Sequence, residues 1–165
     1  MHLRRPRLSD KEAVLEMIAE FEKHNSAMDG GFYKSSLDYE DWLESLAYAE
    51  MGLNIPEGFV PYIQFVAFDE NNQALGFLNL RLRLNSKLRQ KGGHIGYSIR
   101  PNQRGRGYAK EQLRLGLLEA KAKNILEVLI TCHKTNSASR AVILANGGRL
   151  KDKSDNIERY TINLT

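Results

Sequence analysis

The sequence predicts an α+β domain with a mixed β-sheet. Apolar residues with a helical period and apolar residues with an alternating period follow one another along the chain, without a compositional break. In the second half, a strand, a helix and a strand follow at the spacing of a βαβ unit, which predicts parallel strands there. With 165 residues, of which 42% are hydrophobic, we expect residues 1–165 to form a single domain.

Two helices are expected in the first third of the chain. Residues 9–12 read Ser-Asp-Lys-Glu, the pattern of a capping box, and apolar residues at helical spacing follow, so we expect a helix over residues 10–22. Residues 24–35 are polar and contain two glycines, which predicts a loop. Apolar residues from Tyr39 to Leu46 repeat at helical spacing and predict a second helix that ends near Gly52.

The middle of the chain is expected to form strands. Residues 62–68 are apolar and rich in aromatic side chains, which predicts a first strand. In residues 78–84, four leucines alternate with one asparagine and two arginines, which predicts a strand with one buried and one polar face. Residues 95–99 alternate in the same way, and we expect these two strands to be antiparallel neighbours across the connection at residues 87–93.

The rest of the chain is expected to alternate helices and strands. Apolar residues over 109–120 mark one face of a helix. Residues 126–132 form a nearly continuous apolar run, as expected of a strand covered on both faces. A helix over residues 137–146 should stop at the two glycines that follow it, and alternation over residues 160–164 predicts a last strand.

Composition and charge narrow the classes of function. The formal net charge of +4 would attract anionic partners, but no aromatic residues interleave with a basic run, so nucleic acid is the less favoured partner. A single cysteine, Cys132, excludes an internal disulfide and fits a reducing compartment. The sequence has no secretory signal and no apolar run of ~20 residues, which predicts a cytoplasmic protein without a membrane span. Its four scattered histidines lack the spacing of metal ligands.

Residues 104–109 show the clearest pattern of a binding site, and we call them the phosphate turn. They lie where a strand ends and a helix begins, and Gly105 and Gly107 let the backbone come close to a ligand. Backbone N–H groups at a helix N-terminus, with the charges of Arg104 and Arg106, suit a phosphate. A P-loop is excluded because the Gly-Lys-Ser/Thr ending is absent, and a dinucleotide site is excluded because a third glycine is missing. A glycine-rich turn that only starts a helix is the alternative.

Residues 99–109 read Ile-Arg-Pro-Asn-Gln-Arg-Gly-Arg-Gly-Tyr-Ala and resemble the signature of the GNAT superfamily of acyl-CoA N-acyltransferases. That signature is Arg/Gln-x-x-Gly-x-Gly/Ala, and a second family pattern is an asparagine followed by a helix and a glycine. The two patterns are matched by Arg104, Gly107 and Ala109, and by Asn136, Ser139 and Gly147. The order of elements over nearly the whole chain is also similar to this family. The resemblance is closest to bacterial predicted acetyltransferases, whose substrates it does not supply.

The resemblance implies a twisted, mostly antiparallel sheet of about six or seven strands, flanked by about four helices, with a splayed pair of parallel strands at the cofactor site. It also implies acetyl-CoA as co-substrate, with the pyrophosphate on the phosphate turn and the pantetheine arm between the strands that end at Ile99 and near Cys132. The residues that the resemblance implies for cofactor binding are Ile99, Arg104, Gly105, Arg106, Gly107, Tyr108, Ala109, Asn136 and Ser139.

The sequence indicates the general acid and the general base less clearly than the cofactor-binding residues. Many relatives carry a tyrosine seven residues after the asparagine, to protonate the departing thiolate, but Ile143 stands there in this chain. Tyr108 or a water is the alternative acid. His94 and His133 are the candidate general bases, because histidine titrates near neutral pH, and a structural histidine is the alternative for each. Cys132 could suggest a covalent relay, but a buried structural thiol is the favoured interpretation.

These observations predict an N-acetyltransferase that moves an acetyl group from acetyl-CoA to a primary amine by direct attack in a ternary complex. The acceptor is an amine of a small molecule, a peptide or a protein, and the resemblance implies that it enters near the first two helices and the loops between the late strands. We expect Tyr39 and Trp42 in the core, with the lining of an acceptor pocket as the alternative. We expect Arg81 and Arg83 on a solvated face, with selection of an anionic substrate as the alternative. A non-catalytic acyl-CoA-binding sensor and a small basic nucleic-acid-binding domain stay open as alternatives, as does a homodimer.

Overall fold

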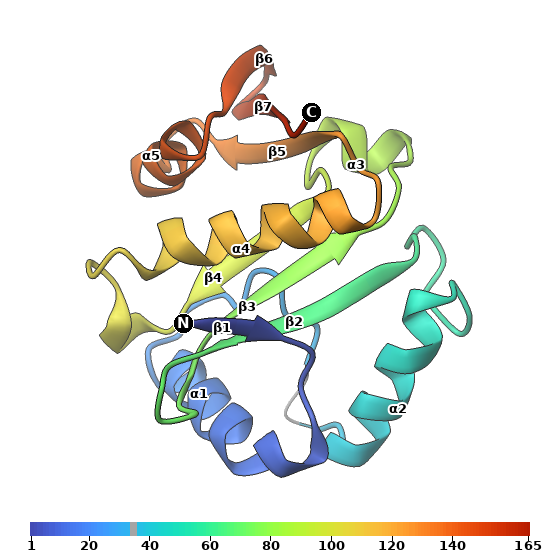
Figure 1. Cartoon of the computed structure of the whole chain (residues 1–165), viewed down its shortest axis with the longest axis vertical. Helices are drawn as coiled ribbons and strands as arrows, with labels where there is room; N and C mark the ends of the chain where they lie inside the picture. Colours follow the sequence, from blue (N-terminus) through green and yellow to red (C-terminus); the bar gives the residue numbers. More distant parts are fainter. Residues whose placement is uncertain (34–35) are drawn as a thin grey trace.

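The computed structural model describes residues 1–33 and 36–165; Lys34 and Ser35, in the predicted loop over residues 24–35, lie outside the described residues. Figure 1 shows a four-stranded sheet with helices on both faces and a smaller sheet beside it. The elements in chain order are β1 His2–Arg4, η1 Leu8–Asp10, α1 Lys11–Lys23, α2 Tyr39–Glu50, β2 Tyr62–Phe68, β3 Ala74–Arg81, α3 Ser86–Gln90, β4 Ile95–Ile99, η2 Pro101–Gln103, α4 Tyr108–Ala122, β5 Glu127–His133, α5 Ser137–Ala145, β6 Arg149–Ser154 and β7 Ile157–Asn163. None of the described helices is long and apolar enough to cross a membrane.

The larger sheet has the strand order β1-β2-β3-β4, and each neighbouring pair is antiparallel. Helices α1 and α2 pack on one face, in a core that includes Tyr39, Trp42 and Phe77. Helix α4 packs on the other face, in a second core that includes Leu78 and Leu113 and is shared with the smaller sheet. The prediction that Tyr39 and Trp42 belong to the core is therefore confirmed.

The predicted polar face of the strand at residues 78–84 is wrong. Strand β3 ends at Arg81, so two of the four leucines lie beyond it, and nearly all of its residues are buried. Asn79 is fully buried, because α1 and α2 cover its face of the sheet and the side chain of Gln64, its partner on β2, accepts a hydrogen bond from Asn79 Nδ2 at 3.2 Å. The predicted antiparallel pairing of β3 with β4 is confirmed, and the unexpected helix α3 lies in their connection.

The smaller sheet has the strand order β5-β7-β6, again antiparallel, so β4 and β5, the strands expected to be parallel, lie in two different sheets. The two strands meet near the start of β4, where the N–H of His94 donates to the carbonyl of Leu129 at 2.8 Å. Farther along, the Tyr97 side chain reaches Ser139, which follows β5 in the chain. The strands thus run in the same direction and diverge, and the expected splayed pair is confirmed.

Local details differ from the expectations at both ends of the chain. Strands β1 and β6 were not predicted from a pattern, because β1 is short and β6 is polar and exposed throughout. The predicted capping box at residues 9–12 is wrong, because η1 precedes α1 and Asp10 accepts hydrogen bonds from the Arg7 N–H at 2.8 Å and from Arg4 at 2.6 Å. The predicted end of α5 is confirmed at Gly147, whose φ of 86° favours glycine.

Candidate active site

The phosphate turn leads from η2 into α4. Gly105 and Gly107 have φ angles of 77° and 82°, and a Cβ at either position would meet nothing within 4 Å. The N–H groups of residues 105–110, which include Tyr108 and Ala109, find no acceptor among the described residues; the first helical bond runs from Glu111 to the Gly107 carbonyl. These N–H groups face open space at the positive end of a helix, so the residues present fit a pyrophosphate.

The two arginines of the phosphate turn have different surroundings. The Arg104 guanidinium donates to the Ile99 carbonyl and to Ser26 Oγ, both at 2.8 Å. It therefore ties the phosphate turn to the end of β4 and to the loop that follows α1. Arg106 is exposed and has no hydrogen-bond partner in the described part of the chain. Arg106 is thus the arginine that is free to meet a phosphate.

The edge of β4 that faces β5 has main-chain groups available for a ligand. Two hydrogen bonds fix which groups face β3 instead: Arg100 N–H to the Leu75 carbonyl at 2.9 Å, and Arg81 N–H to the His94 carbonyl at 2.7 Å. Because these groups alternate along an antiparallel pair, the odd-numbered residues of β4, including Tyr97 and Ile99, direct theirs toward β5. The Ile99 carbonyl is occupied by Arg104, so the Ile99 N–H and both groups of Tyr97 remain.

His94 closes the narrow end of the gap between β4 and β5. Its Nδ1 accepts the N–H of Leu129 at 2.9 Å, which places the ring proton on Nε2. Burial, followed by the charges of Arg81 and Arg89, lowers the pKa of His94 to about 4, so the ring is neutral at pH 7. With Nδ1 occupied and Nε2 protonated, the ring has no lone pair free to take a proton. This geometry favours a structural role over that of a general base.

His133, the other candidate base, lies exposed at the end of β5. Its Nδ1 accepts the N–H of Thr135 at 3.2 Å and lies 2.7 Å from Thr135 Oγ1. The ring proton therefore sits on Nε2, and the geometry favours a role in holding the turn into α5.

Over residues 1–33 and 36–165, no group of three or more histidine, cysteine, aspartate or glutamate side chains is placed to hold a metal ion.

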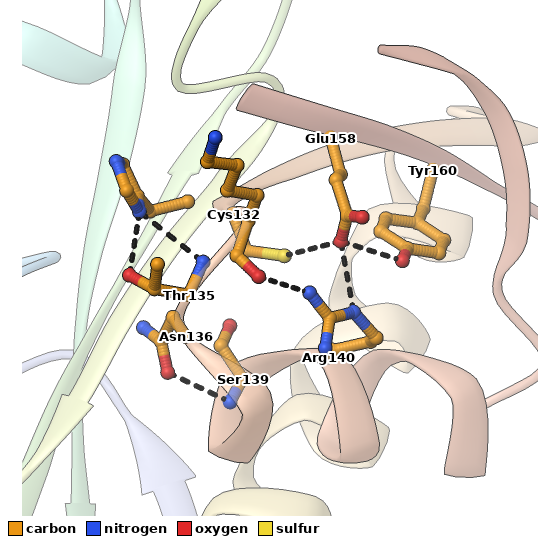
Figure 2. A network of polar contacts seen from close by, with 9 residues as sticks. Cys132, Thr135, Asn136, Ser139, Arg140, Glu158 and Tyr160 are labelled. Atoms are coloured by element: carbon orange, nitrogen blue, oxygen red, sulfur yellow. Dashed lines mark hydrogen bonds and ion pairs between the residues drawn. The ribbon is translucent and has the colours of Figure 1, made fainter. Parts of the chain in front are cut away.

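The start of α5 is fixed by a network of polar contacts (Figure 2). Asn136 caps the helix, because its Oδ1 accepts the N–H of Ser139 at 3.1 Å, and its Nδ2 stays available to a ligand. Glu158 on β7 accepts from Arg140 Nε at 2.8 Å and from the Tyr160 hydroxyl at 3.0 Å. The bond from Arg140 holds the pKa of Glu158 below its usual value, so this ion pair joins α5 to the smaller sheet.

Cys132 belongs to the same network. Its Sγ lies 3.9 Å from Glu158 Oε1, and Figure 2 shows it beside that carboxylate. Burial, with the negative charge of Glu158, raises the pKa of the Cys132 thiol. A nucleophilic cysteine needs a lowered pKa. The arrangement favours the interpretation of Cys132 as a buried structural thiol over a covalent relay.

Tyr97 and Ser139 join the two sides of the gap at its open end. Their hydroxyls lie 3.0 Å apart, and burial raises the pKa of Tyr97 to about 12, so the phenol stays protonated. Ile143 is fully buried and follows Ser139 by one turn on the same side of α5. The Tyr97 hydroxyl thus reaches the helix on which many relatives carry the tyrosine. Sequence reasoning missed this contact, although Tyr97 lies in the segment at residues 95–99 that leads into the signature.

A cavity of about 230 Å³ lies on the α1 and α2 side of the sheet, beside the start of β4, and we call it the aromatic pocket. Its lining includes Phe32, Phe59, Tyr62, Asn79 and Arg81. The three rings lie in mutual contact, with centroids 5.5 to 6.4 Å apart. The expectation of a solvated face for Arg81 is therefore wrong, whereas Arg83 is exposed as expected. No sequence pattern marked the aromatic pocket, because its lining comes from separate segments.

A second cavity, of about 310 Å³, lies beside Tyr108 at the start of α4. Its lining includes Asp69 and Glu70, whose carboxylates would repel a phosphate. The charges of this lining therefore disfavour the cavity as a site for a pyrophosphate.

Comparison with solved structures gives the fold. A ribosomal-protein alanine acetyltransferase from Vibrio fischeri has a TM-score of 0.71 at 16% identity, covering 98% of this chain and 91% of its own. A putative acetyltransferase from Salmonella typhimurium, with its cofactor acetyl-CoA, has a TM-score of 0.63 at 16% identity and coverages of 99% and 94%. A chimeric spermidine N-acetyltransferase from Vibrio cholerae has a TM-score of 0.64 at 18% identity and coverages of 99% and 97%.

Comparison of the sequence with protein families gives the family. No curated protein matches the chain. The model of the acetyltransferase (GNAT) domain matches residues 1–149, which include the phosphate turn, both strands of the splayed pair and the capping asparagine of α5. The chain therefore belongs to the GNAT acetyltransferase family and is an acyl-CoA-dependent N-acyltransferase with acetyl-CoA as its co-substrate.

Proposed function

We propose that this protein transfers the acetyl group of acetyl-CoA to a primary amine by direct attack in a ternary complex. The observation that carries the proposal is the continuity of two binding surfaces, the free N–H groups of the phosphate turn and the free edge of β4. Together they lead from a phosphate site into the gap between β4 and β5. Proteins of the same fold include one that acetylates an alanine of a ribosomal protein and one that acetylates spermidine, which agrees with an amine acceptor.

Main-chain groups would hold most of the co-substrate. The N–H groups of residues 105–110 would bind the pyrophosphate, with Arg106 as an additional charge. The free groups of Tyr97 and the Ile99 N–H would pair with the pantetheine arm, and Asn136 Nδ2 would contact the arm from α5. When bound, acetyl-CoA supplies the thioester carbon that the amine attacks, so that a C–N bond forms as the C–S bond breaks.

Tyr97 and Ser139 are our candidates for stabilising the departing thiolate. The pKa of Tyr97, about 12, exceeds the value of ~8.5 for an alkyl thiol, so a full proton transfer from the phenol to the thiolate would be unfavourable. A hydrogen bond from the phenol requires no transfer and still favours the charged sulfur. In this proposal the thiolate takes its proton from water, and the hydroxyl pair replaces the tyrosine that is absent at Ile143.

The acceptor amine has to be neutral when it attacks. No acidic side chain lines the aromatic pocket in the described part of the chain, whereas Arg81 and Lys87 both do. Nearby positive charge lowers the pKa of an ammonium group, so the aromatic pocket would favour the neutral amine. Water would accept the proton that the amine loses after attack.

A cytoplasmic setting is part of the proposal, because the single cysteine, Cys132, is unpaired and buried.

The test is the release of free thiol from acetyl-CoA, measured with and without added amines. The proposal predicts release that depends on the amine and a stoichiometric amount of N-acetylated product. A non-catalytic sensor would bind acetyl-CoA and show no release that depends on an amine. Binding to nucleic acid that weakens steeply with salt, without binding of acetyl-CoA, would favour the third alternative.

A further inference from the structure

Arg81 differs from the other arginines that are withdrawn from solvent in this structure. Arg4, Arg100, Arg140 and Arg159 each pair with a carboxylate. Arg81 is only partly exposed, and among the described residues it has no carboxylate within salt-bridge distance. Its Nη1 donates to the carbonyls of Gly92 and Gly93 at 2.9 and 3.1 Å, which fixes the side chain and leaves Nη2 and Nε without acceptors. A positive charge is thus held in the aromatic pocket without a partner.

Asn79 presents an unpaired acceptor to the same pocket. Its side chain is fully buried, and its Oδ1 has no hydrogen-bond partner within the described residues. The orientation of the amide is fixed, because Gln64 Nε2 donates to the carbonyls of Gly30 and Phe65 and so turns its Oε1 toward Asn79 Nδ2. Gly96 is the cross-strand partner of Asn79, and a Cβ at Gly96 would lie 3.2 Å from Arg81 Nη2 and 3.5 Å from the backbone of Gly30, so the Arg81 guanidinium lies close to this pair. An N–H group of a ligand would satisfy the free oxygen.

The aromatic residues supply the apolar part of the site. Tyr62 is buried, whereas Phe32 and Phe59 keep 37% and 38% of their surface exposed. The volume of about 230 Å³ is below the ~300–1,000 Å³ of pockets for drug-sized ligands, so it suits one small group. An apolar side chain of a small acceptor would cover the exposed ring faces.

Asn79 and Arg81 lie on the same face of the larger sheet. They are two positions apart on β3, which separates their Cα atoms by ~6.8 Å. One small ligand can therefore offer a polar group to each of the two side chains. The amine and the carboxylate of an α-amino acid are joined by a single carbon and form such a pair of groups.

We propose that the acceptor is a free α-amino acid with an apolar or aromatic side chain, bound in the aromatic pocket with its carboxylate on Arg81 and its amine on Asn79. This inference rests on the proposed function, since it names the acceptor of the same reaction. The amine would lie on β3, the neighbour of β4 in the larger sheet, and β4 borders the gap that receives the thioester. A polyamine is disfavoured, because its several positive charges would meet Arg81 and Lys87 and no carboxylate of the described lining.

The experiment compares three acceptors with the same ring and a primary amine: L-phenylalanine, L-phenylalaninamide and 2-phenylethylamine. Thiol release is measured for each, with kcat/KM expressed per neutral amine, and spermidine is included as a fourth acceptor. We expect phenylalanine to exceed both analogues that lack the carboxylate by at least about tenfold, because only its carboxylate can pair with Arg81. Equal values for the three, or a higher value for spermidine, would overturn the proposal.

The matched variants are Arg81→Gln and Arg83→Gln, since Arg83 is exposed and lies two residues beyond Arg81. Arg81→Gln should remove the preference for phenylalanine over the two analogues without a carboxylate, and Arg83→Gln should keep that preference. An equal loss for all three acceptors in Arg81→Gln would indicate a purely structural role and overturn the proposal. Thermal unfolding of both variants confirms that they are folded.

A binding measurement separates this inference from the proposed function. Phenylalanine is titrated calorimetrically into the full chain, with and without coenzyme A. Binding that depends on Arg81 supports the acceptor class even if no thiol is released, in which case the transfer reaction is wrong. The opposite result is transfer to amines with or without a carboxylate, together with no binding of phenylalanine either with or without coenzyme A. That result supports the transfer reaction and overturns the acceptor class.

Discussion

The phosphate turn and the aromatic pocket lie at opposite ends of β4 and are built from different groups. The phosphate turn offers main-chain N–H groups from one continuous segment, residues 105–110. The aromatic pocket offers side chains from β2, β3, α3 and the loops that contain Phe32 and Phe59. One site therefore depends on backbone conformation, and the other depends on residue identity.

This difference has a physical consequence for how each site can change. A backbone site requires glycine where φ is positive, as at Gly105 and Gly107, and tolerates variation elsewhere. A site made of side chains, such as the aromatic pocket, can bind a different ligand after a single substitution that keeps the fold. Proteins with this fold can therefore bind the same co-substrate through the backbone and still bind different acceptors through their side chains.

The largest effect is expected at Gly107. In Gly107→Glu, a carboxylate would enter the phosphate turn, so acetyl-CoA should no longer stabilise the protein. For the wild-type protein, acetyl-CoA at ~100 times its dissociation constant should raise the free energy of unfolding by about 2.7 kcal/mol. The melting temperature then rises by several degrees. Thermal unfolding with and without acetyl-CoA measures this difference.

The control for this variant is Gly147→Glu. Gly147 has a φ of 86° and open space around its Cβ position, as Gly107 does at 82°, so both variants share a strain of ~1–2 kcal/mol. Gly147 lies at the end of α5, outside the phosphate turn. Gly147→Glu should therefore keep the full stabilisation by acetyl-CoA. An equal loss in both variants would contradict the assignment of the phosphate site.

The second effect concerns the open end of the gap. Tyr97→Phe removes the hydroxyl that lies 3.0 Å from Ser139 Oγ and should lower kcat about tenfold, with little change in the KM for the amine. Steady-state kinetics with a fixed amine and saturating acetyl-CoA measure both constants. Tyr160→Phe also removes a buried tyrosine hydroxyl, from the network around Glu158, and should leave kcat nearly unchanged. If the two variants behave alike, the role of Tyr97 in stabilising the thiolate is wrong.

The third effect is a dependence of stability on pH. The pKa of His94 is about 4 in the folded protein and ~6.5 in the unfolded chain, so between these values only the unfolded state binds the proton. Stability should therefore fall as the pH falls from 6.5 to 4, by at most about 3 kcal/mol from this group. His94→Asn keeps an acceptor for the Leu129 N–H and does not titrate, so its stability should fall less over this range. Urea unfolding at several pH values compares the two proteins.

The same variant tests the two interpretations of His94. A general base contributes ~10²–10⁴-fold to the rate, so His94→Asn should be nearly inactive at pH 7.5 if His94 is the base. The structure predicts turnover within a few-fold of wild type, because the imidazole has no free lone pair. Retained stability with lost turnover would restore His94 as the base.

The smallest effect is expected at Cys132. Cys132→Ala should leave kcat within about twofold and lower stability by about 1 kcal/mol, since the buried thiol contacts the network and does not react. A covalent relay would instead require the thiol and predicts complete loss of turnover. Mass spectrometry of the protein after incubation with acetyl-CoA alone provides the second readout, and an acetylated Cys132 would contradict direct transfer.

The co-substrate side could be predicted from the sequence because its pattern is local. Strand, glycine turn and helix follow one another within residues 95–122, and the requirement for glycine is written in the chain itself. The splay between β4 and β5 could be expected only from the family resemblance. The spacing alone predicted that β4 and β5 are parallel, and it did not indicate that β5 pairs with β7 in a separate sheet.

Of the acceptor side, the sequence indicated only Arg81, as an alternative, because the groups of the aromatic pocket meet only in the folded protein. Phe32 and Arg81 are far apart in sequence and line the same pocket. The alternation at residues 78–84 placed Asn79 and Arg81 on a solvated face, since a pattern shows which residues share a face and not what covers that face. Covering by α1 and α2 buried Asn79 and left its oxygen unpaired.

We claim that the free N–H groups of the phosphate turn hold the co-substrate by its pyrophosphate. Calorimetric titration compares acetyl-CoA with acetyl-pantetheine, which lacks the pyrophosphate and the nucleotide. The pyrophosphate would accept at least two charge-assisted hydrogen bonds of about 1.5 kcal/mol each. Without them, the dissociation constant of acetyl-pantetheine should be at least about 100-fold larger than that of acetyl-CoA. Equal affinity for the two compounds, or no binding of acetyl-CoA at millimolar concentration, would contradict the claim.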